Sequence, residues 1–199
     1  MDGTLADTAK VTAAAFEEAG KLFNLPKLNA DKIRDAIGIG GIDFYLSLYP
    51  EQPKEVLIDF AREAEYLERI KTSVLGEEIL FPDVKKTLEN LSKDGYYLYI
   101  ASTGDKEHVH TTLSAGKIER LFTGISCGEP EKILMVKNMI AGRDAYEWIM
   151  IGDRSKDSNA AKANNIFSLG AGFGYLNKKD YKLFDAVIDK PEDIYEYVG

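Results

Sequence analysis

The sequence predicts an α/β protein, in which a parallel sheet with helices on both faces is interrupted near its start by an all-helical segment. Residues 9–80 place their apolar side chains at helical spacing. After residue 80, short apolar runs alternate with helical patterns, and several runs end at a glycine or a small polar residue. Strands that alternate with helices are typical of a parallel sheet.

Composition narrows the class of protein. The chain has 199 residues, of which 45% are apolar and 29% charged, as in a globular protein with a real core. A net charge of −8 argues against nucleic acid or an anionic membrane as the main partner. Cys127 is the one cysteine, so an internal disulfide is excluded. The sequence has no apolar run of membrane-spanning length and no signal-peptide pattern, so we expect a cytoplasmic protein. We expect it to be a monomer or a homodimer.

The first part of the chain predicts helices that are separated by proline and glycine. Pro26 ends the first helix, and Asn29 or Asp31 can cap the second. The run Gly38-Ile39-Gly40-Gly41 separates the second helix from the third. The expected helices cover residues 9–23, 32–37, 42–49 and 54–71.

The remainder predicts alternating strands and helices. The expected strands cover residues 96–101, 124–127, 148–151, 166–169 and 186–188. The expected helices cover residues 81–93, 106–115, 131–140, 158–164 and 191–197. In the helix over 131–140, Ile133, Leu134 and Ile140 are among the residues spaced to cover one face. The α/β core then comprises residues 1–10 and 80–199, and the helical insert comprises residues 11–79.

Two aspartates follow the apolar run over 148–151. Gly152 turns the chain, so Asp153 stands just past the carboxyl end of a strand, where open α/β sheets bind ligands. Asp157 stands at the start of the next helix. Two carboxylates in this arrangement suit Mg²⁺. A turn aspartate and a helix-capping aspartate are the ordinary alternatives.

Three other stretches place polar residues where a strand ends or would end. They contain Asp2 with Thr4, Ser102 with Thr103, and Lys132. Taken singly, these residues have ordinary explanations: a turn, a helix cap and a solvated lysine. Their order and spacing together are more informative.

That order resembles the four motifs of the haloacid dehalogenase-like hydrolase superfamily. The matching stretches are Asp2-Gly3-Thr4-Leu5, Ile100-Ala101-Ser102-Thr103-Gly104, Lys132 and Gly152-Asp153-Arg154-Ser155-Lys156-Asp157. The resemblance runs over essentially the whole chain and implies a Rossmann-like core. The helical insert resembles the cap of the phosphoglycolate phosphatase and β-phosphoglucomutase branch. Phe81-Pro82-Asp83-Val84 is similar to that branch's return to the core, with Asp83 where glycine is usual.

The resemblance implies a Mg²⁺-dependent phosphatase that acts on a small phosphorylated metabolite. In this family an aspartate attacks phosphorus and forms an aspartyl-phosphate, which water then hydrolyses. The aspartate two residues further on matches Asp2. It serves as general acid and base, and its backbone carbonyl binds the metal.

The other motifs imply a phosphate site and a metal site. Thr4, Ser102, Thr103, Gly104 and Lys132 would bind phosphate, and Ser102 and Lys132 would also assist catalysis. Asp153 would hold Mg²⁺, with Asp157 acting directly or through water. We prefer Lys132 to Lys137, which lies deeper in the helix.

One departure concerns the nucleophile. The family pattern is Asp-x-Asp-Gly-Thr, and Met1 occupies the x position, so the nucleophile would precede Met1. The strand that carries it, central in this fold, would precede Met1 as well. A sheet without its central strand leaves a void and unpaired backbone groups. We therefore hypothesise that the natural protein extends upstream and that the chain as given is inactive.

The remaining features leave alternatives open. The Gly38-Ile39-Gly40-Gly41 loop either reaches over the active site and sets substrate choice or is a plain turn. Residues 170–174 indicate a loop beside the site, and we reject a dinucleotide-binding motif there. His108 and His110 are expected on an exposed helix surface. A phosphosugar mutase is the sister activity, and a non-catalytic phosphate-ligand binder is the alternative if the chain starts at Met1.

Overall fold

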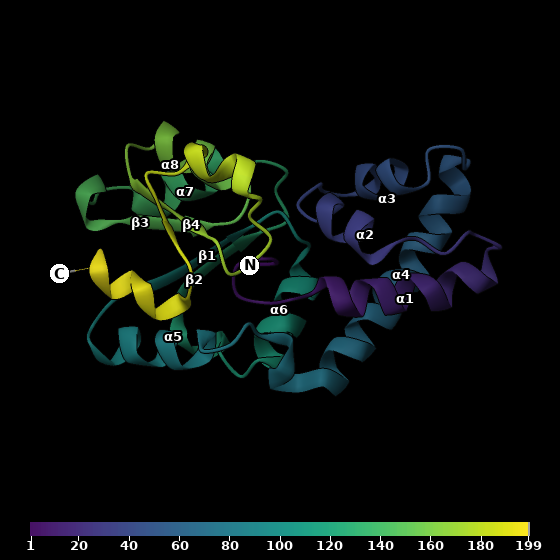
Figure 1. Ribbon diagram of the computed structural model, residues 1–199, viewed down its shortest axis with the longest axis horizontal. Helices are drawn as coiled ribbons and strands as arrows, with labels where there is room; N and C mark the ends of the chain where they lie inside the picture. Colours follow the sequence, from purple (N-terminus) through teal and green to yellow (C-terminus); the bar gives the residue numbers. More distant parts are fainter. Residues whose placement is uncertain (199) are drawn as a thin grey trace.

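A computed structural model describes residues 1–198 and shows a helical part beside an α/β part (Figure 1). The helical part contains α1 (Ala9–Leu22), α2 (Ala30–Ala36), α3 (Ile42–Leu48) and α4 (Lys54–Leu75). Phe16 and Phe60 lie at its centre, with ring centroids 5.1 Å apart, and Tyr45 stacks on Phe16 at 5.6 Å. The insert is all-helical, as expected. Its helices bury their apolar faces against one another in this cluster.

The α/β part follows the expected alternation of strands and helices. Its strands are β1 (Leu98–Ser102), β2 (Phe122–Cys127), β3 (Ile149–Gly152), β4 (Phe167–Ala171) and β5 (Ala186–Ile188). Its α-helices are α5 (Val84–Lys93), α6 (Lys106–Ala115), α7 (Lys132–Ile140) and α8 (Ser155–Ala163). Short 3₁₀ helices cover Gly76–Ile79, Glu119–Leu121, Ala145–Glu147, Lys178–Leu183 and Pro191–Glu196. The limits of the helical insert, residues 11–79, stay a prediction.

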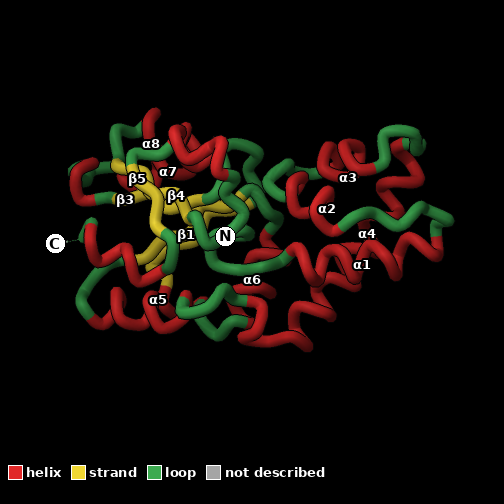
Figure 2. Tube along the Cα trace, viewed as in Figure 1, coloured by secondary structure: helices red, strands yellow, loops and turns green. Residues whose placement is uncertain are grey.

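All the strand pairs in the described chain are parallel, which confirms the fold class. Figure 2 shows the strands in yellow with helices in red on either side of them. One face of the sheets packs against α7 and α8, where Val136 and Ala160 meet Met150. The other face packs against α5 and the 3₁₀ helix Pro191–Glu196, through Leu91 and Ile194. Helices therefore cover both faces.

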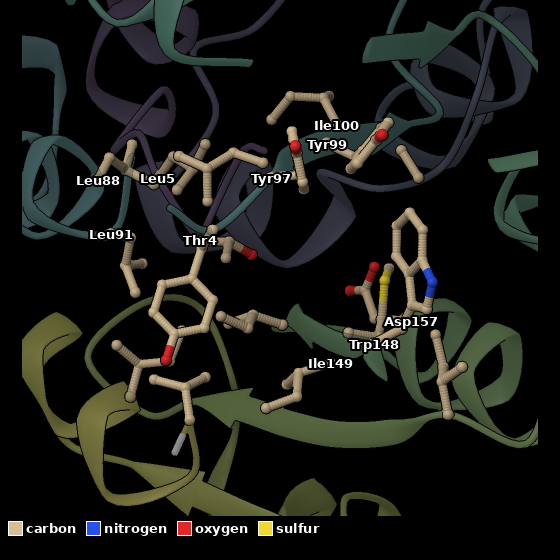
Figure 3. A pocket seen from close by; sticks show the side chains of 18 of the residues that line it. Thr4, Leu5, Leu88, Leu91, Tyr97, Tyr99, Ile100, Trp148, Ile149 and Asp157 are labelled. Atoms are coloured by element: carbon tan, nitrogen blue, oxygen red, sulfur yellow. The ribbon is translucent and has the colours of Figure 1, made fainter. Parts of the chain in front are cut away.

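The strands form two separate sheets. β1 pairs with β2, and β3 pairs with β4, which pairs with β5; within residues 1–198 no pairing joins β1 to β3. A cavity of about 490 Å³ lies between these two edges, and Figure 3 shows its lining. Leu98 and Ile100 line it from β1, and Ile149 and Ile151 from β3. We call this cavity the sheet gap. Its walls are mostly apolar, and each edge presents backbone groups without a strand partner.

Several element boundaries and faces differ from the prediction. Tyr96 and Tyr97 precede β1, and the Tyr97 side chain is exposed, because the strand begins only where the chain pairs with β2. The apolar face expected for α7 is wrong: Leu134 is 66% exposed, whereas Lys132 and Met135 are buried. The helix is rotated so that a lysine, not a leucine, faces the interior.

The longest helix, α4, runs to Leu75, past the expected end near residue 71. Charged residues recur along its length, including Arg62, Arg69 and Lys71. None of the helices in the described part of the chain is long and apolar enough to cross a membrane.

Asp83 provides a test of backbone strain. It precedes α5 in the left-handed conformation, with φ 61°, and its side chain makes no capping hydrogen bond. Asp83→Gly should raise the free energy of unfolding by up to about 1 kcal/mol, because relief of left-handed strain is partly offset by a freer unfolded chain. Urea denaturation measures the change. The control Asp43→Gly, inside α3, should lower the free energy by about 0.5 kcal/mol. Equal destabilisation by both variants would contradict the assignment.

Candidate active site

The first residues form a tight turn that packs against the end of β3. The carbonyl of Met1 accepts backbone hydrogen bonds from Thr4 at 3.2 Å and from Leu5 at 2.8 Å. Gly3 adopts a φ of 71°, and a β-carbon there would collide with the carboxylate of Asp153. Glycine is required at this position, because both the backbone conformation and the close approach exclude a side chain. The turn therefore sets Asp2 and Thr4 beside β3.

Asp153 is a buried carboxylate with one oxygen short of hydrogen bonds. Its Oδ1 accepts a hydrogen bond from Thr4 Oγ1 at 2.8 Å. Its Oδ2 lies 3.2 Å from Arg154 Nε, but the angle is unsuitable, so both atoms are buried without a hydrogen bond in the described structure. Burial and the nearby charge of Asp157 raise the pKa of Asp153 to about 6. Such a carboxylate is suited to receive a cation.

Asp157 both caps α8 and forms a buried ion pair. Because α8 starts at Ser155, earlier than predicted, Asp157 lies in its first turn. Its Oδ2 accepts the backbone N–H groups of Asp153 at 3.1 Å and Arg154 at 3.0 Å. Its Oδ1 accepts a hydrogen bond from Lys132 Nζ at 2.6 Å. The capping role is therefore observed, together with a buried ion pair, and the role of Asp157 at a metal stays a prediction.

The Lys132–Asp157 pair is stabilised in its charged form. Burial alone would raise the pKa of Asp157, but the attraction of Lys132 lowers it below its ordinary value. Burial alone would lower the pKa of Lys132, but Asp157 raises it. Lys132 also feels the charges of Asp153 and Asp2. The structure thus brings these predicted residues together, and exposed Lys137 lies elsewhere on α7.

Ser102 ends β1 and is buried, while Thr103 and Gly104 form the loop that follows. The Ser102 Oγ accepts the backbone N–H of Gly104 at 3.2 Å. Gly104 lies close to the ring of His108, in the first turns of α6. His108 therefore lies next to both this loop and Asp2.

His108 contradicts the expectation of an exposed residue. Its Nε2 lies 2.8 Å from Oδ1 of Asp2, and its Nδ1 lies 3.8 Å from Oε1 of Glu68 on α4. Burial alone would raise the pKa of Asp2, but the charge and hydrogen bond of His108 lower it. Burial alone would lower the pKa of His108, but Asp2 raises it to about 10. At neutral pH the pair is therefore an imidazolium and a carboxylate, and Nε2–H donates to Asp2.

A second cavity, of about 290 Å³, lies between the helical part and the core. We call it the cap cleft. Asp2, Thr103 and Gly104 line it from the core, and residues 37–41 line it from the helical part. The Gly38–Gly41 loop therefore does face the site. Arg154 joins the two parts, because its Nη2 donates to the carbonyl of Arg34 on α2 at 2.6 Å.

The glycine-rich stretch over residues 170–174 lies beside the site, as expected. Gly170 and Ala171 belong to β4, and the loop starts after them. A β-carbon on Gly174 would collide with the carbonyl of Gly3. The glycine thus permits close packing on the first turn.

The donor set suits Mg²⁺ in part. Within residues 1–198, no group of three or more histidine, cysteine or acidic side chains is arranged to hold a metal. Mg²⁺ commonly keeps several waters and takes only one or two carboxylates. Asp153 offers a buried oxygen, Oδ2, that accepts no hydrogen bond and lies 3.2 Å from Arg154 Nε, whereas both oxygens of Asp157 already accept hydrogen bonds. Asp153 fits a direct ligand, and Asp157 fits a residue that acts through water.

Sequence reasoning missed His108 and Arg154 as parts of the site. His108 follows Ser102 by six positions in a helix, and the sequence does not show which way that helix turns. Arg154 lies inside the last motif, but its partner is a backbone carbonyl distant in sequence. The available signal was position alone: Arg154 lies two residues after the end of β3, and His108 lies in the first turn of the helix that follows β1.

A family model described as haloacid dehalogenase-like hydrolase matches residues 1–171. The chain belongs to this family. Two bacterial phosphoglycolate phosphatases are similar in sequence. The one from Vibrio parahaemolyticus is 27% identical, over 100% of this chain and 93% of that protein. The one from Aquifex aeolicus is 28% identical, over 98% and 92%.

Solved structures of haloacid dehalogenase-like hydrolases share the fold. A family hydrolase from Streptococcus pneumoniae superposes with a TM-score of 0.84 at 24% identity, over 99% of this chain and 94% of that one. A β-phosphoglucomutase from Clostridium difficile superposes with a TM-score of 0.78 at 18% identity, over 98% and 91%. These likenesses show the fold class that the sequence predicted.

Lys132 and Lys137 offer a matched test of the buried ion pair. Lys132→Met should lower the free energy of unfolding by about 3–5 kcal/mol, because it leaves the Asp157 carboxylate buried without its counter-charge. Lys137→Met, on the exposed side of the same helix, should change it by less than about 0.5 kcal/mol. Urea denaturation at neutral pH measures both. Similar values for the two variants would contradict the ion pair.

His108 predicts a pH dependence of stability. Its folded pKa is raised to about 10 from 6.5, so its stabilisation is complete below pH 6.5 and is lost as pH rises towards 10. The free energy of unfolding should fall in this range by up to roughly 1.4 kcal/mol per pH unit. His108→Gln should remove that slope, whereas His110→Gln, whose ring is bound to Glu119 on the surface, should keep it. A slope unchanged in His108→Gln would refute the assignment.

Proposed function

We propose that this protein is a Mg²⁺-dependent phosphatase that acts on a small phosphorylated metabolite. The observation that carries the proposal is the buried cluster of Thr4, Lys132, Asp153 and Asp157 beside Asp2. It combines a buried cation, which suits a phosphate, with a carboxylate oxygen that is free to bind a metal. The similarity to phosphoglycolate phosphatases supports phosphate monoesters as the substrate class.

The metal site would be built by Asp153, by the backbone carbonyl of Asp2 and, through water, by Asp157. Bound Mg²⁺ would neutralise the charge that collects on the phosphoryl oxygens. Thr4 holds Asp153 in position through its 2.8 Å hydrogen bond. Lys132 fixes Asp157 and brings a positive charge to the same place.

The phosphate would be bound by Lys132 together with Ser102, Thr103 and Gly104. Ser102 is buried at the end of β1, so its hydroxyl is held at the sheet edge where the other groups converge. Asp2 is the general acid and base. His108 Nε2 holds the Asp2 carboxylate at 2.8 Å and so orients it beside the cap cleft. In its ionised form Asp2 is ready to accept a proton from water.

The sheet gap supports an aspartate nucleophile that precedes Met1. The gap runs between the two unpaired edges to Lys132 and Asp157. The amino group of Met1 is buried within range of the charges of Lys132, Asp2 and Asp157. An extended segment in the gap would pair with β1 and β3 and fill the apolar cavity. Its last residue, directly before Met1, would lie among the site groups, as an attacking carboxylate must.

The cap cleft supports a small substrate. Its volume of about 290 Å³ is at the lower end of the range for small-molecule sites. We propose that the Gly38-Ile39-Gly40-Gly41 loop contacts the alcohol portion of the substrate, because the loop faces Asp2 across the cleft. A cytoplasmic location and a monomeric or homodimeric state stay predictions.

Hydrolysis of p-nitrophenyl phosphate with Mg²⁺ tests the proposal on three proteins. The first is residues 1–199. The second adds a strand of alternating apolar residues that ends in aspartate directly before Met1, and the third is identical but ends in asparagine. The aspartate form should be at least about a thousandfold more active than the asparagine form, and removal of Mg²⁺ should abolish its activity.

The other outcomes separate the alternatives. Equal activity of the aspartate and asparagine forms would contradict a nucleophile before Met1. Phosphate binding by all three proteins without hydrolysis would favour a non-catalytic binder. Transfer of phosphate between two positions of a phosphosugar, without its release, would favour a mutase.

A further inference from the structure

The cap cleft has a phosphate end and an alcohol end. Asp2, Thr103 and Gly104 line the first end, next to the proposed phosphate site. Side chains of α3 and α4 line the other end. If the proposed function is correct, a phosphate held at the first end places the alcohol portion of its ester against α4. The chemistry of α4 then selects the substrate.

Two glutamates of α4 face this end of the cleft. Glu65 Oε1 accepts a hydrogen bond from Tyr45 Oη at 2.9 Å, and Glu68 Oε1 accepts one from Thr12 Oγ1 at 2.7 Å. For the second oxygen of each carboxylate, residues 1–198 provide no hydrogen-bond donor. Burial raises the pKa of both glutamates, because water solvates their charged forms poorly. The second oxygen of each carboxylate is therefore open to a donor from a ligand in the cleft.

The positive groups of the cleft are already engaged. Arg69 Nη1 lies 3.4 Å from Oε2 of Glu107, and His108 Nε2 lies 2.8 Å from Asp2. Asp105, at the start of α6, adds another acid to the lining. In the cleft lining, the acids Glu65, Glu68 and Asp105 outnumber Arg69, the one cation beside them that is not paired with Asp2. The alcohol end of the described chain therefore carries an excess of negative charge.

We propose that the alcohol portion of the substrate is neutral, bears hydroxyl groups and has no carboxylate. Hydroxyl groups can donate to the open oxygens of Glu65 and Glu68 and so satisfy them. A carboxylate at the same place would oppose both glutamates and leave their oxygens without donors. The preferred ligands are polyol or sugar phosphates. The carboxylated ester named for the similar phosphatases, phosphoglycolate, is disfavoured.

Two esters of equal chain length test this preference. The second carbon carries a hydroxyl group in 2-hydroxyethyl phosphate, whereas it is a carboxylate carbon in phosphoglycolate. Isothermal titration calorimetry of the 199-residue chain with Mg²⁺ should show at least about tenfold tighter binding of 2-hydroxyethyl phosphate. Inorganic phosphate serves as the reference ligand for the phosphate end.

Substitutions in α4 test whether the carboxylates of Glu65 and Glu68 cause the ligand preference. Glu65→Gln and Glu68→Gln, made singly, should each reduce the ratio of the two affinities severalfold, because an amide adds donors and removes the charge. Glu63→Gln, on the same helix but outside the cleft lining, should leave the ratio unchanged. Glu65 is only partly buried, so its variant keeps the test open if Glu68→Gln does not fold.

The outcomes distinguish the two proposals. Tighter or equal binding of phosphoglycolate would overturn the substrate preference. An affinity ratio that changes in neither Glu65→Gln nor Glu68→Gln would overturn it as well. In both cases, binding of inorganic phosphate would still support the proposed function. Absence of binding by inorganic phosphate and by both esters would instead overturn the proposed function.

Discussion

The buried ion pair between Lys132 and Asp157 is the interaction on which the site depends. Its 2.6 Å contact joins the first residue of α7 to the first turn of α8. The other oxygen of Asp157 binds the backbone of Asp153 and so fixes the turn after β3. Because a buried carboxylate is costly without partners, the two helices and the strand end are held in one arrangement. That arrangement leaves Asp153 Oδ2 without a hydrogen bond, next to the Arg154 guanidinium.

A second constraint is the geometry of the two sheets. β1 and β3 each carry a helix that supplies part of the site, yet their facing edges are separated by the sheet gap. Met1 lies at the end of the gap nearest Lys132, so the first turn, with Asp2 and Thr4, closes that end. An unfilled apolar cavity of this size forfeits the contacts of its lining residues. The gap therefore lowers the packing of the core next to the candidate site.

The helical part is held over the site by polar contacts from the core. Glu68 of α4 approaches His108, which holds Asp2, and Arg154 binds a carbonyl of α2. The contacts that position the helical part also place charged side chains in the lining of the cap cleft. His108 thus links Glu68, which lines the cap cleft, to Asp2 of the first turn.

The sequence by itself determined the fold class, the all-helical insert and the order of the site residues, since these depend on periodicity, on turn residues and on motif spacing along the chain. It could not determine how each helix is rotated: Lys132 is buried while Leu134 is exposed, and His108 faces Asp2. Those outcomes depend on partners distant in sequence, such as Asp157 for Lys132 and Glu68 for His108. Only the tertiary structure brings such charges together. The position of a buried charged side chain depends on its ion-pair partner, and the sequence pattern around the residue does not show that partner.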